Sequence, residues 1–442
     1  MSDDVVETIF SYLPIKKLFA LAVLSRRYRF SWRCCRDLSF DKSFAKNLSR
    51  DEFINIVNNF FQHRLDSSAD RFCLYFDATN VTNLVVNWIQ QGVSLGIKEL
   101  ELDFTPSQTK FILGHDLINV ASIEIMKLVN CEINLPLDLN GLCNLRELTF
   151  ENMRANPMVI QAILIHCLAL KKLQFIHCSS NRDLNICARD SKRFQILVVK
   201  DCHGVESVNI DAPTLSSFHY HGKVCEFNFQ SDLFQLNDVI LDIVHPRGFN
   251  RIPRIKDVAI SLAFVKTLTI TSIFLEGLGP RFDGNEYKEM DFFLWKLKEF
   301  HLVVATESYI NPYDVAIFLK KCPYVERVFI DLAPNAFGHS LNWDLHGRNY
   351  LSECITIFPF LTCVKLKGFT TKELPVMMAK FFLRNAIHLQ YLILVKAKKF
   401  DSSTIFNPDC LRWGISSTAN IRMYDYRRDT SIITSEHMKD VY

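Results

Sequence analysis

The sequence has 442 residues, of which 49% are apolar and 22% are charged. This balance is that of a globular protein and excludes a largely disordered chain. Lysine and arginine total 51 against 48 aspartate and glutamate residues, and a nucleic-acid binder usually has a larger basic excess. The 36 phenylalanines predict a large buried core.

The 14 cysteines contain no C-x-x-C pair and no Cys/His spacing typical of a zinc finger or RING domain. The first residues are acidic, whereas a secretory leader begins with basic ones. The one leader-like stretch, Leu18 to Leu24, is far shorter than the roughly 18 residues of a membrane span. We therefore expect reduced thiols, no membrane insertion, and a cytoplasmic or nuclear location.

Residues 1–45 have the pattern of three short helices. Asp3 or Asp4 can cap the first helix, and Pro14 ends it because the residue before a proline avoids the helical region. The second helix is predicted over 16–25 and a third around Tyr28 and Trp32, which share a face. Apolar periodicity predicts further helices over 49–63 and 84–91.

From residue 97 an apolar triplet of the form L-x-x-L-x-L recurs, from Ile97-Leu100-Leu102 to Leu389-Leu392-Leu394. Triplets arise by chance in a chain this apolar, so their spacing carries the prediction. The first steps, of 22 to 26 residues, match the period of a leucine-rich repeat. Between 194 and 236 the steps shorten to 9 to 12, which predicts tight turns or adjoining strands. Later steps leave room for helices over 313–321 and 377–385. The alternative is a conventional α/β protein.

Three stretches carry a resemblance to a known family. The first zone resembles the F-box of plant F-box proteins, the middle resembles that family's leucine-rich repeats, and the last resembles the FBD-type region that closes many of its members. The matching runs are Asp3 to Val6, Ile9 to Pro14, Ala22 to Arg29 with Trp32, Leu38 to Asp41, Val86 to Ile89 with Gly96 to Leu102, and Phe360 to Phe369 followed by Phe381 to Ala386 and Leu389 to Leu392.

The resemblance implies an α/β fold, in which a three-helix F-box precedes a curved leucine-rich-repeat solenoid. Such a solenoid has mainly parallel strands, with helices or loops on the convex side. The expected boundaries are 1–45 for the F-box, 46–95 for a linking helical segment and first strand, 96–350 for the repeats, and 351–442 for FBD-like repeats and the tail.

The function implied is that of a substrate receptor in an SCF-type ubiquitin ligase. The F-box would bind a Skp-type adaptor, which is attached to a cullin, and the repeats would bind an unidentified target protein. A module this small cannot bury all its apolar residues internally, which leaves a face for a partner. The candidate residues for that face or its support are Leu13, Pro14, Leu21, Leu24 and Trp32.

The alternative function is a leucine-rich-repeat scaffold with a truncated F-box that no longer binds the adaptor. Two departures from the family pattern motivate it. The pattern usually opens with Leu-Pro just before the position of Asp3, where this sequence has Met1-Ser2, and it usually has tryptophan at the position of Tyr28.

The strand register predicts which charges face a target. If the second and third apolar positions of each triplet point inward, the residues between and beside them lie on the opposite, concave face. That face would change from acidic to basic along the chain, which suits a protein target better than a nucleic acid. Its candidate target-binding residues are Glu99, Glu101, Asp103, Glu147, Glu151, Lys365 and Lys367.

Catalytic and cofactor motifs are missing from the sequence. The pair of glycines at Gly277 and Gly279 lacks the third glycine of a nucleotide loop, and no hydrolase, zinc-protease or Walker pattern occurs. His219 and His221 share one face of a predicted strand, with His203 nearby, but we find no matching carboxylate or thiol in register and expect them to face solvent. We therefore expect no catalytic residue, cofactor or metal, and the remaining rival, an α/β enzyme, lacks a catalytic constellation.

Overall fold

A computed structural model describes residues 9–437 of the chain, apart from 11, 65–67, 135–138, 245–251, 279–291, 307, 309, 335–350, 352–355, 399–405, 432–434 and 436. It comprises two compact units. Unit 1 is Met1–Val205 with Asn209–Ala212, and unit 2 is Glu206–Val208 with Pro213–Tyr442. The predicted caps at Asp3 and Asp4, and Cys354, lie outside the described residues.

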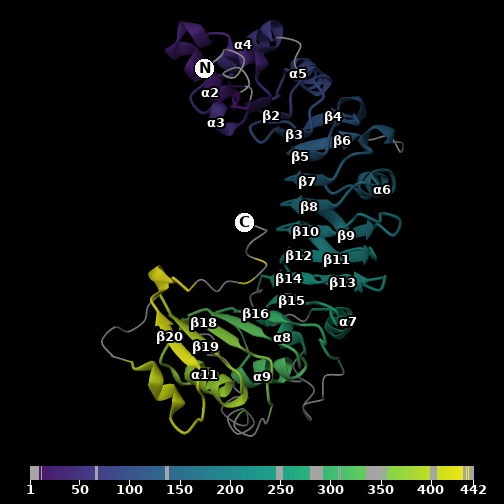
Figure 1. The fold of residues 1–442 in the computed structure, drawn as a ribbon. Coiled ribbons are helices and arrows are strands. Elements are labelled where there is room, and N and C mark those ends of the chain that lie inside the picture. Colours follow the sequence, from purple (N-terminus) through teal and green to yellow (C-terminus); the bar gives the residue numbers. More distant parts are fainter. Residues whose placement is uncertain are drawn as a thin grey trace. The chain divides into compact units, whose positions relative to one another are not determined.

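Unit 1 begins with helices and continues as strands that alternate with helices or turns (Figure 1). Its elements are α2 (Ile15–Leu24), η1 (Arg26–Tyr28), η2 (Ser31–Cys34), β1 (Asp37–Phe40), α3 (Lys42–Ala45), α4 (Arg50–His63), β2 (Arg71–Tyr75), α5 (Thr82–Ser94), β3 (Glu99–Asp103), β4 (Phe111–Gly114), η3 (His115–Leu117), β5 (Ile125–Val129), β6 (Cys131–Asn134), η4 (Asn140–Leu142), β7 (Glu147–Glu151), α6 (Pro157–His166), β8 (Lys172–Ile176), β9 (Ser179–Cys187), β10 (Ile196–Lys200) and β11 (His203–Asp211).

The N-terminal helices pack onto the first strands through a cluster of aromatic rings. Helix α4 begins with a capping box, in which Ser49 and Glu52 satisfy each other's backbone N–H groups. The Phe40 ring, at the end of β1, lies 5.5 Å from that of Phe60 on α4. The α5 residue Trp88 is buried and donates a hydrogen bond of 2.8 Å to the Asn58 amide. This packing makes the helical module continuous with the repeats.

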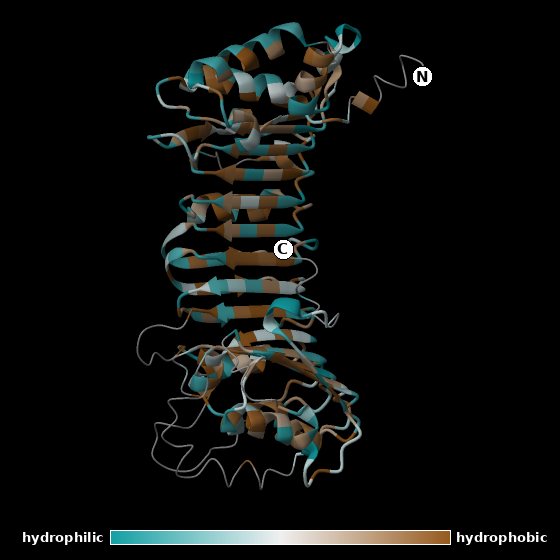
Figure 2. Ribbon diagram, turned by 90° about the vertical axis from the view of Figure 1, so that its left-hand side faces the viewer, coloured by the Kyte–Doolittle hydropathy of each residue, from teal (hydrophilic) through white to brown (hydrophobic). Residues whose placement is uncertain are grey.

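The main sheet of unit 1 is parallel, in the order β1-β2-β3-β5-β7-β8-β10. Its side chains alternate between a buried row and a half-buried row, as in β3, where Leu100 and Leu102 are buried and Glu101 is not. Figure 2 shows this alternation of hydrophobic and hydrophilic residues along the strands. The sheet starts at residue 37 with β1, and the predicted boundary of the repeats at 96 stays a prediction.

A second layer covers the buried side of this sheet. Helix α6 fills it beside β7 and β8, while further along the chain the strands β9 and β11 take the place of a helix (Figure 1). This arrangement explains the short steps between triplets. The triplet at Val205, Val208 and Ile210 lies in β11 of the second layer, whereas the one before it lies in β10 of the main sheet. One repeat therefore contains two triplets in this region.

Unit 2 continues the same plan with more helices (Figure 1). Its elements are β12 (Ser217–Gly222), β13 (Glu226–Phe229), β14 (Asp238–Ile243), α7 (Ile255–Ser261), β15 (Thr267–Thr271), α8 (Ser272–Leu278), β16 (Glu299–Val304), α9 (Pro312–Lys320), β17 (Arg327–Leu332), β18 (Cys363–Phe369), α11 (Glu373–Asn385), β19 (Tyr391–Lys396), η6 (Pro408–Arg412), β20 (Asn420–Tyr424) and η7 (Tyr426–Arg428).

The strands of unit 2 form a parallel sheet in the order β12-β14-β15-β16-β17-β18-β19-β20. Helices α7, α8, α9 and α11 lie on one side of it (Figure 1). Helices α9 and α11 fall where the sequence predicts them, although α11 begins four residues early. A capping box between Asn311 and Asp314, with Pro312 at the first helical position, fixes the start of α9.

One strand of unit 2 contains an irregularity that requires glycine. The register of β18 shifts between Lys367 and Phe369, and Gly368 has a φ of 77°. A Cβ atom at this position would collide with the backbone carbonyl oxygen of Leu332 on the neighbouring strand β17. Gly414 has a φ of 74°, but a Cβ atom there would meet no atom within 4 Å.

We predict that Gly368→Ala lowers the thermal unfolding midpoint of the chain more than Gly414→Ala does. Both substitutions carry the strain of a left-handed backbone, about 1 kcal/mol, but only the first adds a collision with a strand. Thermal unfolding followed by circular dichroism measures the difference. Equal midpoints for the two variants would contradict the close approach of β17 and β18.

Candidate functional site

The helices and turns at the start of unit 1 expose large apolar side chains. Tyr12, Val23, Leu24 and Phe30 are 65%, 88%, 80% and 55% exposed, and we call these four residues the apolar N-terminal face. Helix α2 turns Ile15 and Leu18 inward, so the residues near its end that lie off this stripe meet solvent. Exposed apolar groups gathered on a small module are typical of a protein-binding surface.

The five predicted adaptor-binding residues lie in or beside this face, with different exposure. Leu24 belongs to it, Pro14 is exposed at the start of α2, and Leu13 and Leu21 are half-buried. The Trp32 ring lies between the rings of Phe19 and Phe60, with centroid distances of 5.8 and 5.6 Å. This position suits a residue that supports the face better than one that contacts a partner. Their role in binding stays a prediction.

Three members of the face, Tyr12, Val23 and Phe30, are not among the residues predicted from the sequence. Val23 lies on α2 away from the buried stripe of that helix, and this position is the signal that could have found it. Tyr12 and Phe30 lie in turns, where helical periodicity gives no signal.

The main sheet of unit 1 presents charged residues on the side away from its buried row. Glu99, Glu101 and Asp103 of β3 lie there, with Glu147 and Glu151 of β7, as the triplet register predicts. We call this side, together with Arg71 of β2 and Lys127 of β5, the unit 1 strand face. The predicted role of these acids in target binding stays a prediction.

The acids of this face alternate with bases instead of forming an acidic surface. Arg71 contacts Glu101 at 2.9 Å, and Lys127 contacts Glu101 at 3.5 Å and Glu151 at 3.0 Å. Within unit 1 the face is therefore mixed in charge, and the predicted change from acidic to basic along the whole chain stays a prediction. Arg71 and Lys127 occupy the same positions on their strands as Glu99 and Glu101 do on β3, but we had not assigned them to the face.

The corresponding side of the unit 2 sheet, which we call the unit 2 strand face, is polar but largely buried. It carries His219, Glu299, His301 and Lys365, each less than a tenth exposed. Lys367 is half-buried and contacts Asp331 at 3.1 Å. Burial alone would raise the pKa of Asp331, but its contacts with His301 and Lys367 lower the pKa below its usual value.

The described residues of the C-terminal tail, from Asp425 onward, cover this face. Lys365 Nζ donates to Asp429 Oδ2 and to Ser431 Oγ, each at 2.7 Å. Ser435 donates to Glu299 of β16. Lys365, which the sequence analysis places on an open target-binding face, is therefore buried by the chain itself, because the tail folds back over a strand 64 residues earlier in the sequence.

The tail ends, among the described residues, at a cluster of two histidines and an aspartate. His219 Nε2 lies 2.7 Å from Asp238 Oδ2, and His437 Nδ1 contacts Asp238 Oδ1. Burial alone would raise the pKa of Asp238, but the hydrogen bonds and charges of both histidines lower it well below its usual value. The expectation that His219 faces solvent is wrong, because Asp238 on the next strand lies within reach of it.

His221 is half-exposed and its Nδ1 contacts Asp242 Oδ2 at 2.6 Å. The predicted absence of matching carboxylates in register is therefore wrong for both strand histidines. His203 is exposed, as expected.

The cluster does not have the geometry of a catalytic triad. Ser217 Oγ lies 3.0 Å from Nε2 of His219, and Asp238 contacts that same nitrogen. In a triad the serine and the carboxylate contact opposite ring nitrogens, which lets the imidazole carry a proton from one side to the other.

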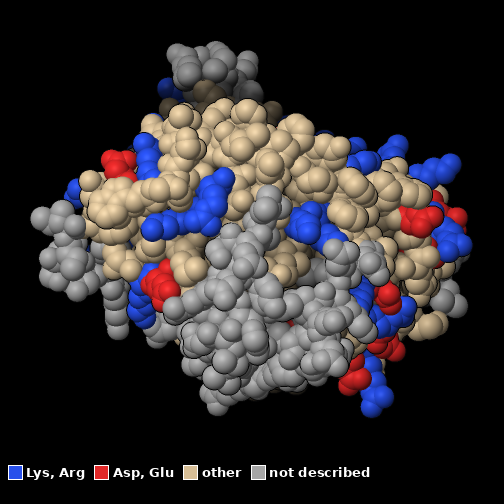
Figure 3. Space-filling view, turned by 90° about the horizontal axis from the view of Figure 1, so that it is seen from below, with Lys and Arg blue, Asp and Glu red and all other residues tan. Residues whose placement is uncertain are grey.

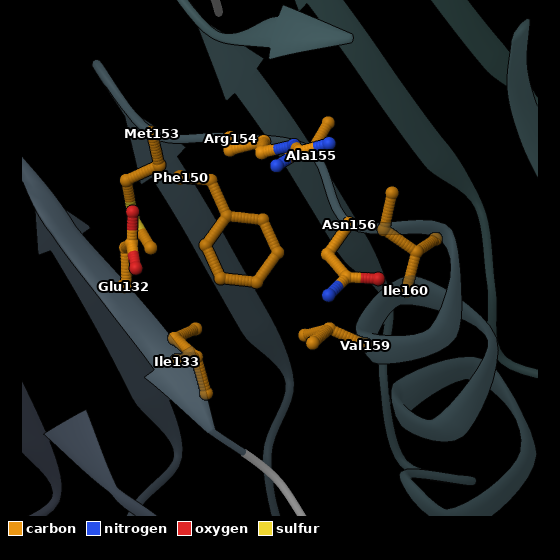
Figure 4. Close-up of a pocket in the computed structure, with 9 residues that line it drawn as sticks. All are labelled: Glu132, Ile133, Phe150, Met153, Arg154, Ala155, Asn156, Val159 and Ile160. Atoms are coloured by element: carbon orange, nitrogen blue, oxygen red, sulfur yellow. The ribbon is translucent and has the colours of Figure 1, made fainter. Parts of the chain in front are cut away.

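A pocket of about 130 Å³ lies between β6, the end of β7 and the start of α6. Figure 4 shows the Phe150 ring at its centre, with Asn156 and Val159 on one side and Glu132 and Met153 on the other. Sites for drug-sized ligands usually have volumes of about 300–1,000 Å³. This pocket is too small for such a ligand, and Asn156 already serves as the N-cap of α6.

On the face seen in Figure 3, lysine and arginine side chains are scattered among uncharged and acidic ones, with no continuous basic surface. Of the helices in the described ranges, none combines the length and apolar character that a membrane crossing needs.

Parallel strands whose buried rows recur with the triplet pattern define a leucine-rich-repeat protein. The leucine-rich-repeat domain family described as At1g61320/AtMIF1 matches residues 70–414. The chain belongs to this family.

Its relatives are plant F-box and leucine-rich-repeat proteins from Arabidopsis thaliana. The FBD-associated F-box protein At1g61320 is 30% identical over 434 residues, which cover 93% of this chain and 91% of that protein. At1g61330 is 29% identical over 427 residues, or 93% of each chain. The F-box/FBD/LRR-repeat protein At2g26030 is 20% identical over 440 residues, or 92% of this chain and 93% of that protein.

The described cysteines are all free thiols, and most of them are buried. Burial raises the pKa of Cys35, Cys131, Cys167 and Cys225 to about 12. At pH 8 such a thiol has a thiolate fraction on the order of 10⁻⁴, and the thiolate is the nucleophile. These cysteines are therefore poorly suited to covalent catalysis.

We predict that iodoacetamide at pH 8 alkylates the exposed Cys143 and Cys187 of the native chain first. The four buried thiols named above should react much more slowly, because both their raised pKa and their burial oppose attack. Below that pKa the rate should rise about tenfold per pH unit. Mass spectrometry of native and denatured samples measures this order, and early labelling of Cys131 or Cys225 would contradict it.

Proposed function

We propose that this chain is the substrate-recognition subunit of an SCF-type E3 ubiquitin ligase. The apolar N-terminal face binds a Skp-type adaptor, which connects the chain to a cullin, and the repeats bind a target protein. The chain itself is not an enzyme; it brings the target to the ligase. This activity places it in the cytoplasm or the nucleus, without a nucleic-acid or membrane partner.

The observation that carries the proposal is the exposure of Val23 and Leu24 at the end of α2. Full burial of an aliphatic side chain of this size contributes roughly 1.5–3 kcal/mol. Tyr12 and Phe30 add larger rings to the same module, so a helical partner that covers all four gains a binding energy typical of interface hot spots. The F-box names of the relatives support the choice of partner.

The family departure at Tyr28 does not remove an aromatic ring from the module. The Tyr28 ring packs edge-on against that of Phe10, with 4.9 Å between the ring centroids. An aromatic ring therefore packs within the module at the position where the family usually has tryptophan. The alternative, a repeat scaffold that does not bind the adaptor, is separated from our proposal by the following experiment.

The double substitution Val23→Asp and Leu24→Asp should weaken adaptor binding by at least about 100-fold, because two buried carboxylates would replace two apolar contacts. Calorimetric titration of the full chain with a purified Skp-type adaptor measures the affinity. Both side chains already face solvent, so the circular dichroism spectrum should not change.

The matched control is Ile165→Asp, on α6, because Ile165 is 55% exposed but lies outside the N-terminal module. It should bind the adaptor as tightly as the wild type. A wild-type chain that fails to bind would support the scaffold function, and equal losses from both variants would contradict the position of the face.

For the target, we propose the unit 1 strand face as the docking surface. Its charged side chains are half-exposed, whereas several polar side chains of the unit 2 strand face are buried by the tail. Alternating charges select a partner of complementary pattern and mainly affect the association rate.

Reversal of Glu99, Glu101 and Asp103 to lysine should slow association with the target that co-purifies with the wild-type chain. The effect should shrink in high salt, because ions screen charges at the surface. Stopped-flow or surface-binding kinetics measure the rate. The control reverses Lys256 and Lys320, which are exposed on helices α7 and α9, and should change little. Equal effects from both sets would contradict the assignment of the face.

A further inference from the structure

The cluster at the end of the tail brings together three side chains that are common metal ligands. His219 comes from β12, Asp238 begins the adjacent strand β14, and His437 comes from the tail. The register places Ser217 opposite Asp238, and His219 lies two residues further along β12, on the same face as Ser217. One ligand atom from each residue lies within 4.8 Å of the other two.

Two polar atoms of this cluster are buried without a hydrogen-bond partner. They are Nδ1 of His219 and Nε2 of His437, whereas Nδ1 of His437 and Oδ1 of Asp238 contact each other. His219 and His437 are 7% and 6% exposed. Burial of a polar atom without a partner is costly, so two in one cluster require an explanation. One ligand atom from each of the three residues lies near the other two, which is an arrangement that a cation can satisfy.

The ligand types indicate which cation. Two imidazole nitrogens and one carboxylate are a ligand set of Zn²⁺, whereas Mg²⁺ and Ca²⁺ prefer oxygen ligands alone. Three protein ligands leave the fourth tetrahedral position for a water molecule or a partner's side chain. Ser217 Oγ donates to Asp238 Oδ2 at 2.8 Å, and such an outer hydrogen bond orients a ligating carboxylate.

The tail reaches the cluster after two other attachments to the same sheet. Asp429 and Ser431 contact Lys365 on β18, and Ser435 contacts Glu299 on β16. The described tail contacts thus progress from β18 through β16 to β14, toward earlier strands. His437 makes the last of these contacts among the described residues. A metal–ligand bond at His437 would therefore hold the end of the tail on the strands.

We propose that His219, Asp238 and His437 form a Zn²⁺ site that fastens the C-terminal tail across the unit 2 strand face. The ion joins two strands of the repeats to a residue about 200 positions later in the sequence, and it binds two buried imidazoles and the Asp238 carboxylate together. With the ion bound, Glu299 and Lys365 stay covered. This inference does not depend on the proposed ligase function.

The first test is metal binding by the full chain. Titration with Zn²⁺ should give one tight site per chain, and Co²⁺ should give the visible absorption of a nitrogen and oxygen site without a thiolate charge-transfer band. His219→Asn and His437→Asn should each weaken Zn²⁺ binding by about 100-fold or more, because each removes one of three ligands. Since His437 lies in the tail, its loss should leave the repeats folded.

The matched control is His221→Asn. His221 lies on the same strand and pairs with Asp242, but no third metal-binding side chain of the described residues joins that pair. Its Zn²⁺ affinity should equal that of the wild type. The proposal is overturned if the wild type binds no stoichiometric Zn²⁺, if the two site variants bind as tightly as the wild type, if His221→Asn is equally impaired, or if Co²⁺ shows thiolate ligation.

The second test follows the tail directly. Hydrogen–deuterium exchange of residues 425–437 should slow when Zn²⁺ is added to the wild type, and this slowing should be absent in His437→Asn. Exchange in β16 and β18 should slow less, because their backbone bonds are already formed. Tail exchange that Zn²⁺ does not change would show that the ion pairs alone hold the tail, and it would overturn the fastening role.

Discussion

The parallel strand ladder is the constraint on which the rest of the structure depends. Because successive side chains of a strand point to opposite sides, each repeat must place apolar residues at every second position, as Leu148 and Phe150 of β7 do. Burial of these rows contributes roughly 25 cal/mol per Å² of apolar surface. The positions between them are free of that demand, so the charged residues of the unit 1 strand face lie there.

Much of the fold follows from the sequence, because periodicity is a local property. The triplets place Leu100 and Leu102 in the core and Glu101 on the opposite side, and helices α9 and α11 fall in the long steps. The candidate site is harder to predict from the sequence, because its contacts join residues that are distant in the chain. The contact of His219 with Asp238 needs the register of β12 against β14, which spacing alone does not give. The cover of Lys365 by Asp429 joins residues 64 positions apart, and no pattern predicts it.

The two strand faces differ in what occupies them. In unit 1 the intervening positions carry a ladder of alternating charges, from Arg71 through Glu101 and Lys127 to Glu151, which is half-exposed and available to a partner. In unit 2 the same kind of position carries buried polar residues that the chain's own tail satisfies. A partner that binds the unit 2 strand face would have to displace the tail. An ion bound at His437 would therefore raise the free energy that this displacement requires. The apolar N-terminal face comprises other residues of unit 1 than its strand face.

The most direct test of the central claim, that the N-terminal helices are an adaptor-binding module, is hydrogen–deuterium exchange of the full chain with and without a Skp-type adaptor. Burial of the apolar N-terminal face should slow exchange between residues 12 and 34 and leave the strands of both units unchanged. Such a result would separate the adaptor surface from the strand faces in one measurement. An adaptor that protects the strands instead, or that protects no segment of the chain, would contradict the account.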